Sequence, residues 1–210
     1  FNRNDISSIK NFIMNFFSQL SHKTPLFGLV LTGGKSTRMK QDKAKLEYHG
    51  KPQFQHTYDL LSTCCEKVFI SSRAEQKEDF PLPQIHDTFL DLGPMGGILS
   101  ALKAYPKTAF LVLACDLPYI TQETLKKLLT NRNTFKIATA YQSPSDSFPE
   151  PLCAIYEPKS KTRLLQFLAL DYSCPRKVLI NSDTKLIHPE QVHEMNNINH
   201  PEEIISLICL

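Results

Sequence analysis

Two different patterns of apolar and polar residues occur along the chain, and together they predict an α/β protein. Short apolar runs bounded by turn-forming residues are typical of buried strands, and apolar residues at every third or fourth position are typical of helices facing a core. The apolar runs predict strands near residues 26–32, 67–71, 109–115, 135–140, 152–156 and 177–180. The spacing of apolar residues at every third or fourth position predicts helices near residues 52–64, 95–104, 121–130, 158–169 and 200–208. A short hairpin is predicted around His49 and Gly50. Alternation of strands and helices favours a mostly parallel sheet.

The N-terminal segment has a separate apolar pattern that predicts an amphipathic helix. Its apolar residues recur at three- and four-residue steps: Ile6, Ile9, Phe12, Ile13, Phe16, Phe17 and Leu20. Polar residues, among them Asn4 and Asp5, interrupt the continuous apolar core that a secretory signal requires. We therefore divide the chain into a helical extension with linker at 1–24 and a domain at 25–210. An apolar stripe of this kind has to pack against another surface, and we expect that surface to be this domain, a second copy or an upstream fused domain. The last possibility is suggested by the start of the sequence at Phe1 rather than at Met.

Composition narrows the classes of partner. With 41% hydrophobic and 21% charged residues among 210, the chain is an ordinary globular sequence that can bury one sizeable core. A net charge of +3 is too small to indicate nucleic acid, and no apolar stretch is long enough to span a membrane. The six cysteines lack paired zinc spacing and the histidines form no metal motif, so we expect reduced thiols and a cytoplasmic protein.

The richest candidate chemistry follows the first predicted strand. The chain breaks there into Gly33-Gly34 and then presents Lys35, Arg38 and Lys43. Paired glycines let backbone N–H groups approach an anion, and the cations can neutralise a polyphosphate, so this segment predicts nucleoside triphosphate binding. A P-loop does not fit, because it needs a glycine five residues before Gly34, where the chain has leucine. The remaining alternative is an ordinary turn with surface lysines.

Two further segments carry acidic residues beside strands or glycines. Asp116 ends the apolar run 109–115, where a carboxylate suits a magnesium ion bridging phosphate oxygens. The alternative for Asp116 is a turn or cap before the next helix. Asp87 leads into the glycine-rich segment 93–97, which opens a helix and would let a flat base lie against the main chain. The alternative there is a tight turn.

Together these segments resemble the molybdenum cofactor guanylyltransferases, the MobA-like nucleotidyltransferases. The family signature Leu-Ala-Gly-Gly-x-Ser-x-Arg-Met-Gly-x-Asp-Lys is similar to residues 31–43, with departures at Thr32 and Lys40. Asp87 with 93–98 resembles the family's Asp and Gly-Pro-Leu-x-Gly-Ile, and Cys-Asp-x-Pro recurs at 115–118. Segments 150–156 and 197–204 resemble the later Pro-Leu-x-Ala-Leu-Tyr and Asn-Ile-Asn-Thr-Pro-Glu elements. Where the family often has Asn, this chain has Ser71-Ser72.

The resemblance implies a Rossmann-like three-layer nucleotidyltransferase fold. It also implies transfer of GMP from GTP to molybdopterin carrying molybdenum, with Mg²⁺ as cofactor and pyrophosphate as the second product. Arg38, Lys43 and Asp116 would be catalytic, with Asp116 also the metal ligand. The nucleotide-binding residues it implies are Leu31, Thr32, Gly33, Gly34, Lys43, Ser71, Asp87, Gly93, Gly96, Gly97 and Asp116.

Two alternatives stay open at this point. The same fold could use CTP or a sugar phosphate, although relatives that use CTP tend to show Ala-Ala-Gly where this chain has residues 32–34. The chain could also be a non-catalytic nucleotide-binding module attached to a partner through its N-terminal helix. The presence of Arg38, Lys43 and Asp116 argues against such a module, because binding alone needs no metal carboxylate opposite a cationic loop.

Overall fold

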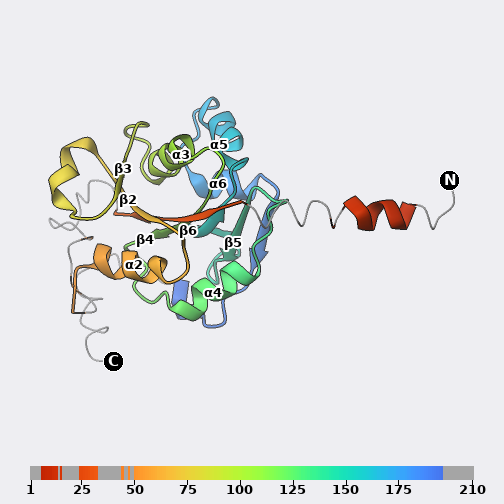
Figure 1. The fold of residues 1–210 in the computed structure, drawn as a ribbon, viewed down its shortest axis with the longest axis horizontal. Helices are drawn as coiled ribbons and strands as arrows, with labels where there is room; N and C mark the ends of the chain where they lie inside the picture. The colour runs from red at the N-terminus through yellow and green to blue at the C-terminus, as the bar shows by residue number, and fades with distance from the viewer. Residues whose placement is uncertain are drawn as a thin grey trace.

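The computed structural model of the chain describes residues 6–13, 15, 24–32, 44, 47 and 50–195. Its centre is a seven-stranded sheet between two layers of helices, with α3, α5 and α6 on one face and α2 and α4 on the other (Figure 1). The strands are β1 Leu26–Leu31, β2 Val68–Ser72, β3 Gln84–His86, β4 Ala109–Ala114, β5 Ala138–Gln142, β6 Pro149–Tyr156 and β7 Thr184–Ile187. The helices are α2 Gln53–Ser62, α3 Pro94–Ala104, α4 Gln122–Thr130, α5 Ser160–Leu168 and α6 Pro175–Ile180, with 3₁₀ helices η2 Ala74–Asp79 and η3 Val192–Met195.

The strand order explains where a ligand can enter. Along the sheet the order is β3-β2-β1-β4-β6-β5-β7. From β1 the chain moves outward to β2 and β3, and then returns to β4 on the other side of β1. These four strands are parallel, whereas β6 runs antiparallel to both β4 and β5. In such sheets the crevice for a ligand lies at the carboxyl ends of the strands where the order reverses, here between β1 and β4.

Each face of the sheet buries its own apolar core. Along β1, Leu29 and Leu31 join the core beneath α3, α5 and α6, whereas Val30 joins the core beneath α2 and α4. Because both faces are covered, β1 and β4 are apolar at nearly every position, as parallel strands between helices require. The edge of the sheet at the strand ends is therefore the part of this framework that can carry polar chemistry.

Most elements lie where the apolar pattern predicts them, and one prediction is wrong. Residues 177–180 are not a strand but the end of α6, whose first residue is Pro175. Proline suits a first helical turn, and the apolar run after it is too short to distinguish a strand from a helix. The two short strands β3 and β7 were not predicted. An antiparallel bridge between Glu47 and Pro52 accompanies the predicted hairpin, and the predicted helix 200–208 lies outside the described residues.

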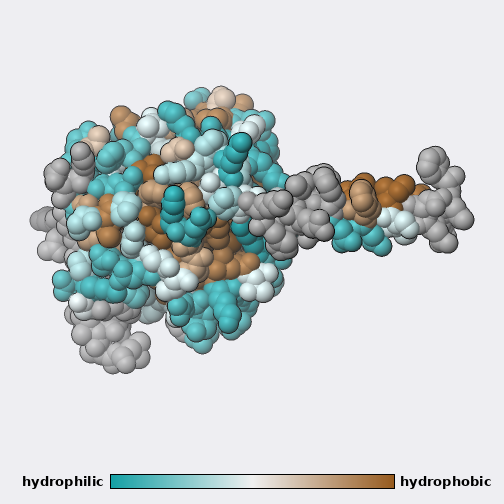
Figure 2. Space-filling model, viewed as in Figure 1, coloured by the Kyte–Doolittle hydropathy of each residue, from teal (hydrophilic) through white to brown (hydrophobic). Residues whose placement is uncertain are grey.

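The N-terminal amphipathic helix is confirmed for residues 6–13. Its apolar side chains are exposed, from 44% at Ile13 to 71% at Phe12. Figure 2 shows apolar residues along one side of this helix and polar residues along the other. Phe16, Phe17 and Leu20 lie outside the described residues. Within the described part of the chain, no helix combines the length and apolar character needed to cross a membrane.

Gly96 provides a test of how α3 is packed. A Cβ added to this buried glycine would lie 2.3 Å from the carbonyl oxygen of Phe89, a backbone atom that cannot move alone. Alanine gains about 1 kcal/mol of helix propensity, but overpacking costs about 1–3 kcal/mol. Because the clash is with a backbone atom, we expect a cost near the upper end of this range, so that Gly96→Ala lowers the free energy of unfolding by about 1–2 kcal/mol in urea titrations. Ala104→Ser, at an exposed position of the same helix, should change it by less than about 0.5 kcal/mol. Equal stability of Gly96→Ala and the natural protein would contradict this packing.

Candidate nucleotide-binding site

A cavity of about 470 Å³ opens at the carboxyl ends of β1 and β2. Its volume lies within the range of about 300–1,000 Å³ that is typical of small-molecule sites. The parallel register of β1 and β2 places Leu31 beside Ser71, so the two strand ends form its base. The lining residues are Leu31, Thr32, Ser71, Ser72, Arg73, Glu75, Gln76, Asp87, Phe89, Leu90, Asp91, Gly93 and Pro94.

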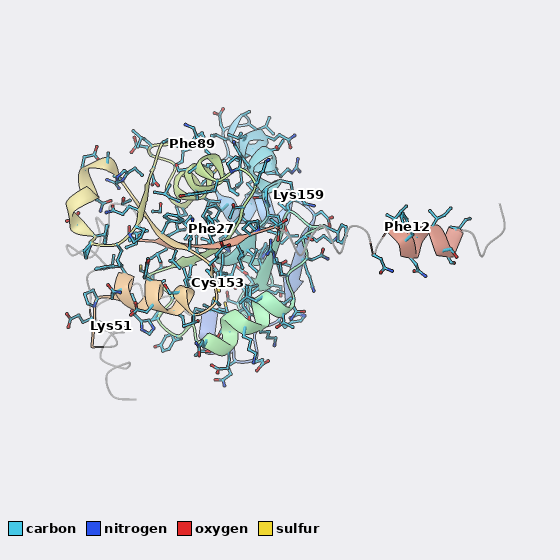
Figure 3. The ribbon with its side chains drawn as sticks, in the orientation of Figure 1. Phe12, Phe27, Lys51, Phe89, Cys153 and Lys159 are labelled. Carbon is cyan, nitrogen blue, oxygen red and sulfur yellow. The ribbon has the colours of Figure 1, made fainter. Side chains whose placement is uncertain are left out.

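The cavity combines apolar and polar walls. Leu31, Phe89, Leu90 and Pro94 supply the apolar surface, while Arg73 and η2 supply charged and amide groups. Phe89 lies beside α3 (Figure 3), and the Lys103 ammonium lies 5.6 Å from the centre of its ring. Apolar surface with a few convergent polar groups is typical of sites that bind small molecules.

The loop from β3 to α3 is held in an uncommon backbone conformation. Asp91 has a φ of 58° and Gly93 a φ of 55°, both in the left-handed region. Gly93 adopts this region without strain, whereas Asp91 is one of few side chains that tolerate it. Both residues line the cavity. Such conformations cluster at ligand sites, where the surrounding structure maintains them.

Asp87 brings a carboxylate to the cavity wall just beyond β3. Its Oδ1 accepts a hydrogen bond of 2.8 Å from the Ser71 hydroxyl, and its backbone N–H donates to the carbonyl of Ser72, also at 2.8 Å. Burial raises the pKa of the Asp87 carboxyl, while the Ser71 hydrogen bond and the charges of Arg73 and His86 act in the opposite direction. A partly buried carboxylate of this kind can accept hydrogen bonds from hydroxyl or N–H groups of a ligand.

Asp116 lies at the same edge of the sheet, beyond β4. The backbone N–H of Cys115 donates to the carbonyl of Leu31 at 3.1 Å, which brings Asp116 close to the end of β1. Leu113 pairs with Cys153 in the antiparallel register of β4 and β6, and continuing this register puts Asp116 across from Glu150. The strand ends on both sides of the switch point therefore carry acidic side chains.

Glu150 is a buried carboxylate, 4% exposed, in this acidic region. It accepts hydrogen bonds of 3.0 Å from the backbone N–H of Leu152 and from Arg176 Nη2. Burial raises the pKa of Glu150, with a further increase from the charge of Asp116 and a partial decrease from these hydrogen bonds and from Arg176. Arg176 also donates to Asp146, so α6 is tied to the β5–β6 turn and to the start of β6.

The donor set fits a hard divalent cation. Magnesium prefers oxygen ligands, retains waters and is commonly held by one or two carboxylates plus substrate phosphates. Asp116 offers such oxygens beside the cavity, and Glu150 adds negative charge next to it. Among the residues that the structure describes, no group of three or more His, Cys, Asp or Glu side chains could hold a metal ion. Asp116 and Glu150 fit an ion that is also bound by a phosphate ligand.

The predicted site residues fall into three groups. Those that line the cavity are Leu31, Thr32, Ser71, Asp87 and Gly93. Gly96 and Gly97 are buried in α3, where their missing side chains permit close packing against the Phe89 carbonyl and the Ser71 hydroxyl. Asp116 lies on the neighbouring strand end, outside the cavity lining. Outside the described residues lie Gly33, Gly34, Arg38 and Lys43.

Several residues of the region were not predicted. Arg73, Glu75 and Gln76 line the cavity, and their polar run directly after a strand was the available signal. Glu150 and Arg176 gave a weaker signal, since an acidic residue before an apolar run is common. Their relation to Asp116 depends on strand pairing that is visible only in the fold.

A doubly wound sheet with a cavity at the carboxyl ends of β1 and β2, next to its switch point, and acidic strand ends beside it is typical of an α/β nucleotide-binding protein. The sequence profile described as the MobA-like NTP transferase domain matches residues 28–186. The chain therefore belongs to the MobA-like NTP transferase domain family and is a nucleotidyltransferase. This confirms the resemblance and the fold class read from the sequence.

Individual relatives agree with the family. The chain is 42% identical to the "Molybdenum cofactor biosynthesis bifunctional protein" of Synechocystis sp. over 86% of this chain and 53% of that protein, so it spans about half of that relative. It is 28% identical to the "Probable molybdenum cofactor guanylyltransferase" of Flavobacterium johnsoniae, over 85% and 94% of the two chains. The molybdopterin-guanine dinucleotide biosynthesis protein A of Archaeoglobus fulgidus shares the fold, with a TM-score of 0.72, 20% identity, and coverage of 87% and 98%.

The raised pKa of Asp87 predicts a pH-dependent stability. Since the folded protein holds this proton more tightly than the unfolded chain, Asp87 favours folding below its ordinary pKa, and this contribution is lost as the pH rises through the folded pKa. We expect Asp87→Asn to raise the Tm at neutral pH, with the gain disappearing below about pH 4. Thermal unfolding across this range measures the effect. Asp91→Asn, at an exposed position lining the same cavity, should leave the Tm unchanged; a lower neutral Tm for Asp87→Asn would contradict the prediction.

Proposed function

We propose that this chain transfers GMP from GTP to molybdopterin carrying molybdenum, forming the guanine dinucleotide cofactor and pyrophosphate. The observation that carries the proposal is the cavity at the carboxyl ends of β1 and β2, with Asp87 in its wall and Asp116 at the end of the neighbouring strand β4. Family membership and relatives named molybdenum cofactor guanylyltransferase support the choice of reaction.

The nucleoside would occupy the cavity, with its base against the apolar surface formed by Leu31, Phe89 and Leu90. Asp87 would accept hydrogen bonds from the base or ribose. The main chain of 31–34 would hold the phosphates, as the sequence predicts for the glycine turn. Gly93 would permit the close approach of its loop, while Gly96 and Gly97 would support that loop and β2 from within α3.

The chemistry requires no nucleophile from the protein. The terminal phosphate of the pterin attacks the α-phosphorus of GTP in line, and pyrophosphate leaves with the electron pair of the broken P–O bond. Catalysis then consists of positioning and charge stabilisation. Arg38 and Lys43 would neutralise the leaving pyrophosphate.

Nucleotidyltransferases of this family generally use a divalent metal ion, and we propose that it is Mg²⁺ held by Asp116. When bound, the ion supplies Lewis-acid stabilisation of phosphate charge. Glu150, across from Asp116, adds to the negative potential that attracts the cation, and Arg176 keeps Glu150 in place.

The N-terminal helix suggests a further molybdenum cofactor biosynthesis domain as partner. Its apolar residues Ile6, Ile9, Phe12 and Ile13 are exposed, and the bifunctional relative in Synechocystis is about twice as long as the matched region. We propose that this helix connects the nucleotidyltransferase domain to such a domain in a longer protein.

Nucleotide preference tests the reaction. The protein is incubated with molybdopterin, Mg²⁺ and GTP, CTP or ATP, and pyrophosphate release is measured together with nucleotide affinity by calorimetry. We expect GTP to bind at least about tenfold more tightly than CTP or ATP, a difference of about 1.4 kcal/mol. Asp116→Asn serves as the control for contaminating enzymes, with turnover reduced by about 10² or more and folding retained. Equal or better use of CTP would refute the guanylyltransferase assignment and leave the fold untouched.

A matched pair of lysines tests the phosphate loop. Lys43 follows the glycine turn, and the resemblance gives it a triphosphate contact, whereas it gives Lys45 none. Losing a charge-assisted hydrogen bond should cost Lys43→Ala about 1.5–3 kcal/mol in GTP affinity or transition-state stabilisation. Lys45→Ala should stay within about 0.5 kcal/mol, and neither substitution should change the Tm without ligand. Similar losses from both would indicate a diffuse basic surface instead of a defined phosphate contact.

A further inference from the structure

Two departures from the family pattern contact each other at the base of the cavity. Thr32 stands where the motif has Ala, and Ser71-Ser72 stands where the family often has Asn. The Thr32 hydroxyl donates a hydrogen bond of 3.0 Å to the carbonyl oxygen of Ser71. Thr32 and Ser71 are each only 6% exposed. A hydroxyl that alanine would lack therefore joins the ends of β1 and β2.

The two serine hydroxyls are both engaged inside the protein. Ser71 Oγ donates to Asp87 Oδ1 at 2.8 Å. Ser72 Oγ donates to Gln84 Oε1 at 2.6 Å and lies 3.1 Å from His86 Nδ1. A hydroxyl has one proton to donate, so these bonds use the protons of both serines. The Ser71 hydroxyl therefore donates its proton to Asp87 and not to a ligand.

The packing of α3 leaves the Ser71 hydroxyl little freedom. A Cβ added to Gly97 would lie 2.3 Å from Ser71 Oγ and 3.0 Å from Leu31 Cδ2. The helix thus lies directly over the hydroxyl. Asp87 is fixed at its backbone by the Ser72 carbonyl and at its carboxylate by Ser71. A side chain of the protein that is held in this way by rigid elements loses little conformational entropy when a ligand binds to it.

We propose that Ser71, held from behind by Thr32, is a positioning residue that orients the Asp87 carboxylate for nucleotide binding and acts through Asp87 rather than through a ligand contact of its own. The proposal rests on the proposed function. With Oδ1 engaged by Ser71, Oδ2 is the oxygen that accepts a hydrogen bond from a ribose hydroxyl or a base N–H. Thr32 keeps the strand end in register so that the Ser71 hydroxyl meets Oδ1.

The charged groups around Asp87 give the positioning role a pH signature. Arg73 and His86 lower its pKa, and the Ser71 hydrogen bond lowers it as well. Among the residues that line the cavity or are described in α3, the other charged groups are Glu75, Asp91 and Lys103, of which Lys103 contacts the Thr88 hydroxyl. All five remain in a Ser71→Ala protein, so only the serine's contribution disappears. Affinity that needs the ionised carboxylate then begins to fall at a higher pH.

The experiment is a double-mutant cycle on nucleotide affinity. Calorimetry with GTP and Mg²⁺ from about pH 4 to pH 8 compares the natural protein, Ser71→Ala, Asp87→Asn and the double variant. We expect Ser71→Ala to weaken binding by about tenfold and to move the acid limb of affinity upward. Any acid limb that persists in Asp87→Asn belongs to groups other than Asp87. Ser71→Ala should cause no further loss in the Asp87→Asn background. An equal loss in both backgrounds would show a direct ligand contact and overturn the proposal.

Variants at Thr32 provide the second arm. Thr32→Ser keeps the hydroxyl and should bind GTP like the natural protein, whereas Thr32→Val should lose several-fold in affinity. Thr139→Val is the matched control, because the Thr139 hydroxyl accepts from the Asn133 N–H at 3.0 Å on β5, outside the cavity lining. Thermal unfolding verifies that each variant is folded. Natural affinity in Thr32→Val would remove Thr32 from the proposal.

The two proposals fail in different ways. If the natural protein prefers another nucleotide, the proposed reaction is wrong, and the cycle is repeated with the nucleotide that binds. Additive effects of Ser71→Ala and Asp87→Asn with that nucleotide would then overturn the positioning role itself.

Discussion

The parallel pairing of β1 with β4 is the constraint on which the site depends. Six residue pairs, from Leu26 with Ala109 to Leu31 with Ala114, align the two buried strands and end them at the same level. Thr32 after β1 and Asp116 after β4 therefore lie at the same end of the sheet. On its other side, β1 pairs with β2 and brings Ser71 to the same edge. A shift of one residue in either pairing would move every side chain to the opposite face and separate these groups.

Much of the fold could be predicted from the sequence because its strands are long and buried on both faces. The runs that become β1 and β4 leave little choice of structure. The failures occur where elements are short. The strands β3 and β7 have three and four residues, which is too few for an apolar pattern to be recognised. They form because each pairs with a neighbouring strand. In α6, an apolar run resembling a strand became a helix because Pro175 starts a turn there and Val178 and Leu179 reach the core.

The candidate site also has a part that could be predicted from the sequence and a part that could not. Thr32, Asp87 and Gly93, which line the cavity, could be predicted because each belongs to a local motif whose residues are adjacent in the sequence. The contacts between residues of different strands could not be predicted from the sequence. The hydrogen bond from Ser71 to Asp87 and the position of Glu150 across from Asp116 both depend on strands that are distant in sequence. The glycines of α3 illustrate the difference, because Gly96 and Gly97 were expected to lie against a base, while the structure gives them contacts with the Phe89 carbonyl and with Ser71.

The short outer strands have a consequence for how the protein behaves at high concentration. An exposed strand edge presents unpaired N–H and C=O groups on which another sheet can grow, and the hazard increases with the length of the edge. Here the outermost strands, β3 and β7, have three and four residues, while the six- and eight-residue strands β1, β4 and β6 lie in the interior. The arrangement that gathers long apolar strands around the site thus also keeps them from serving as templates for aggregation.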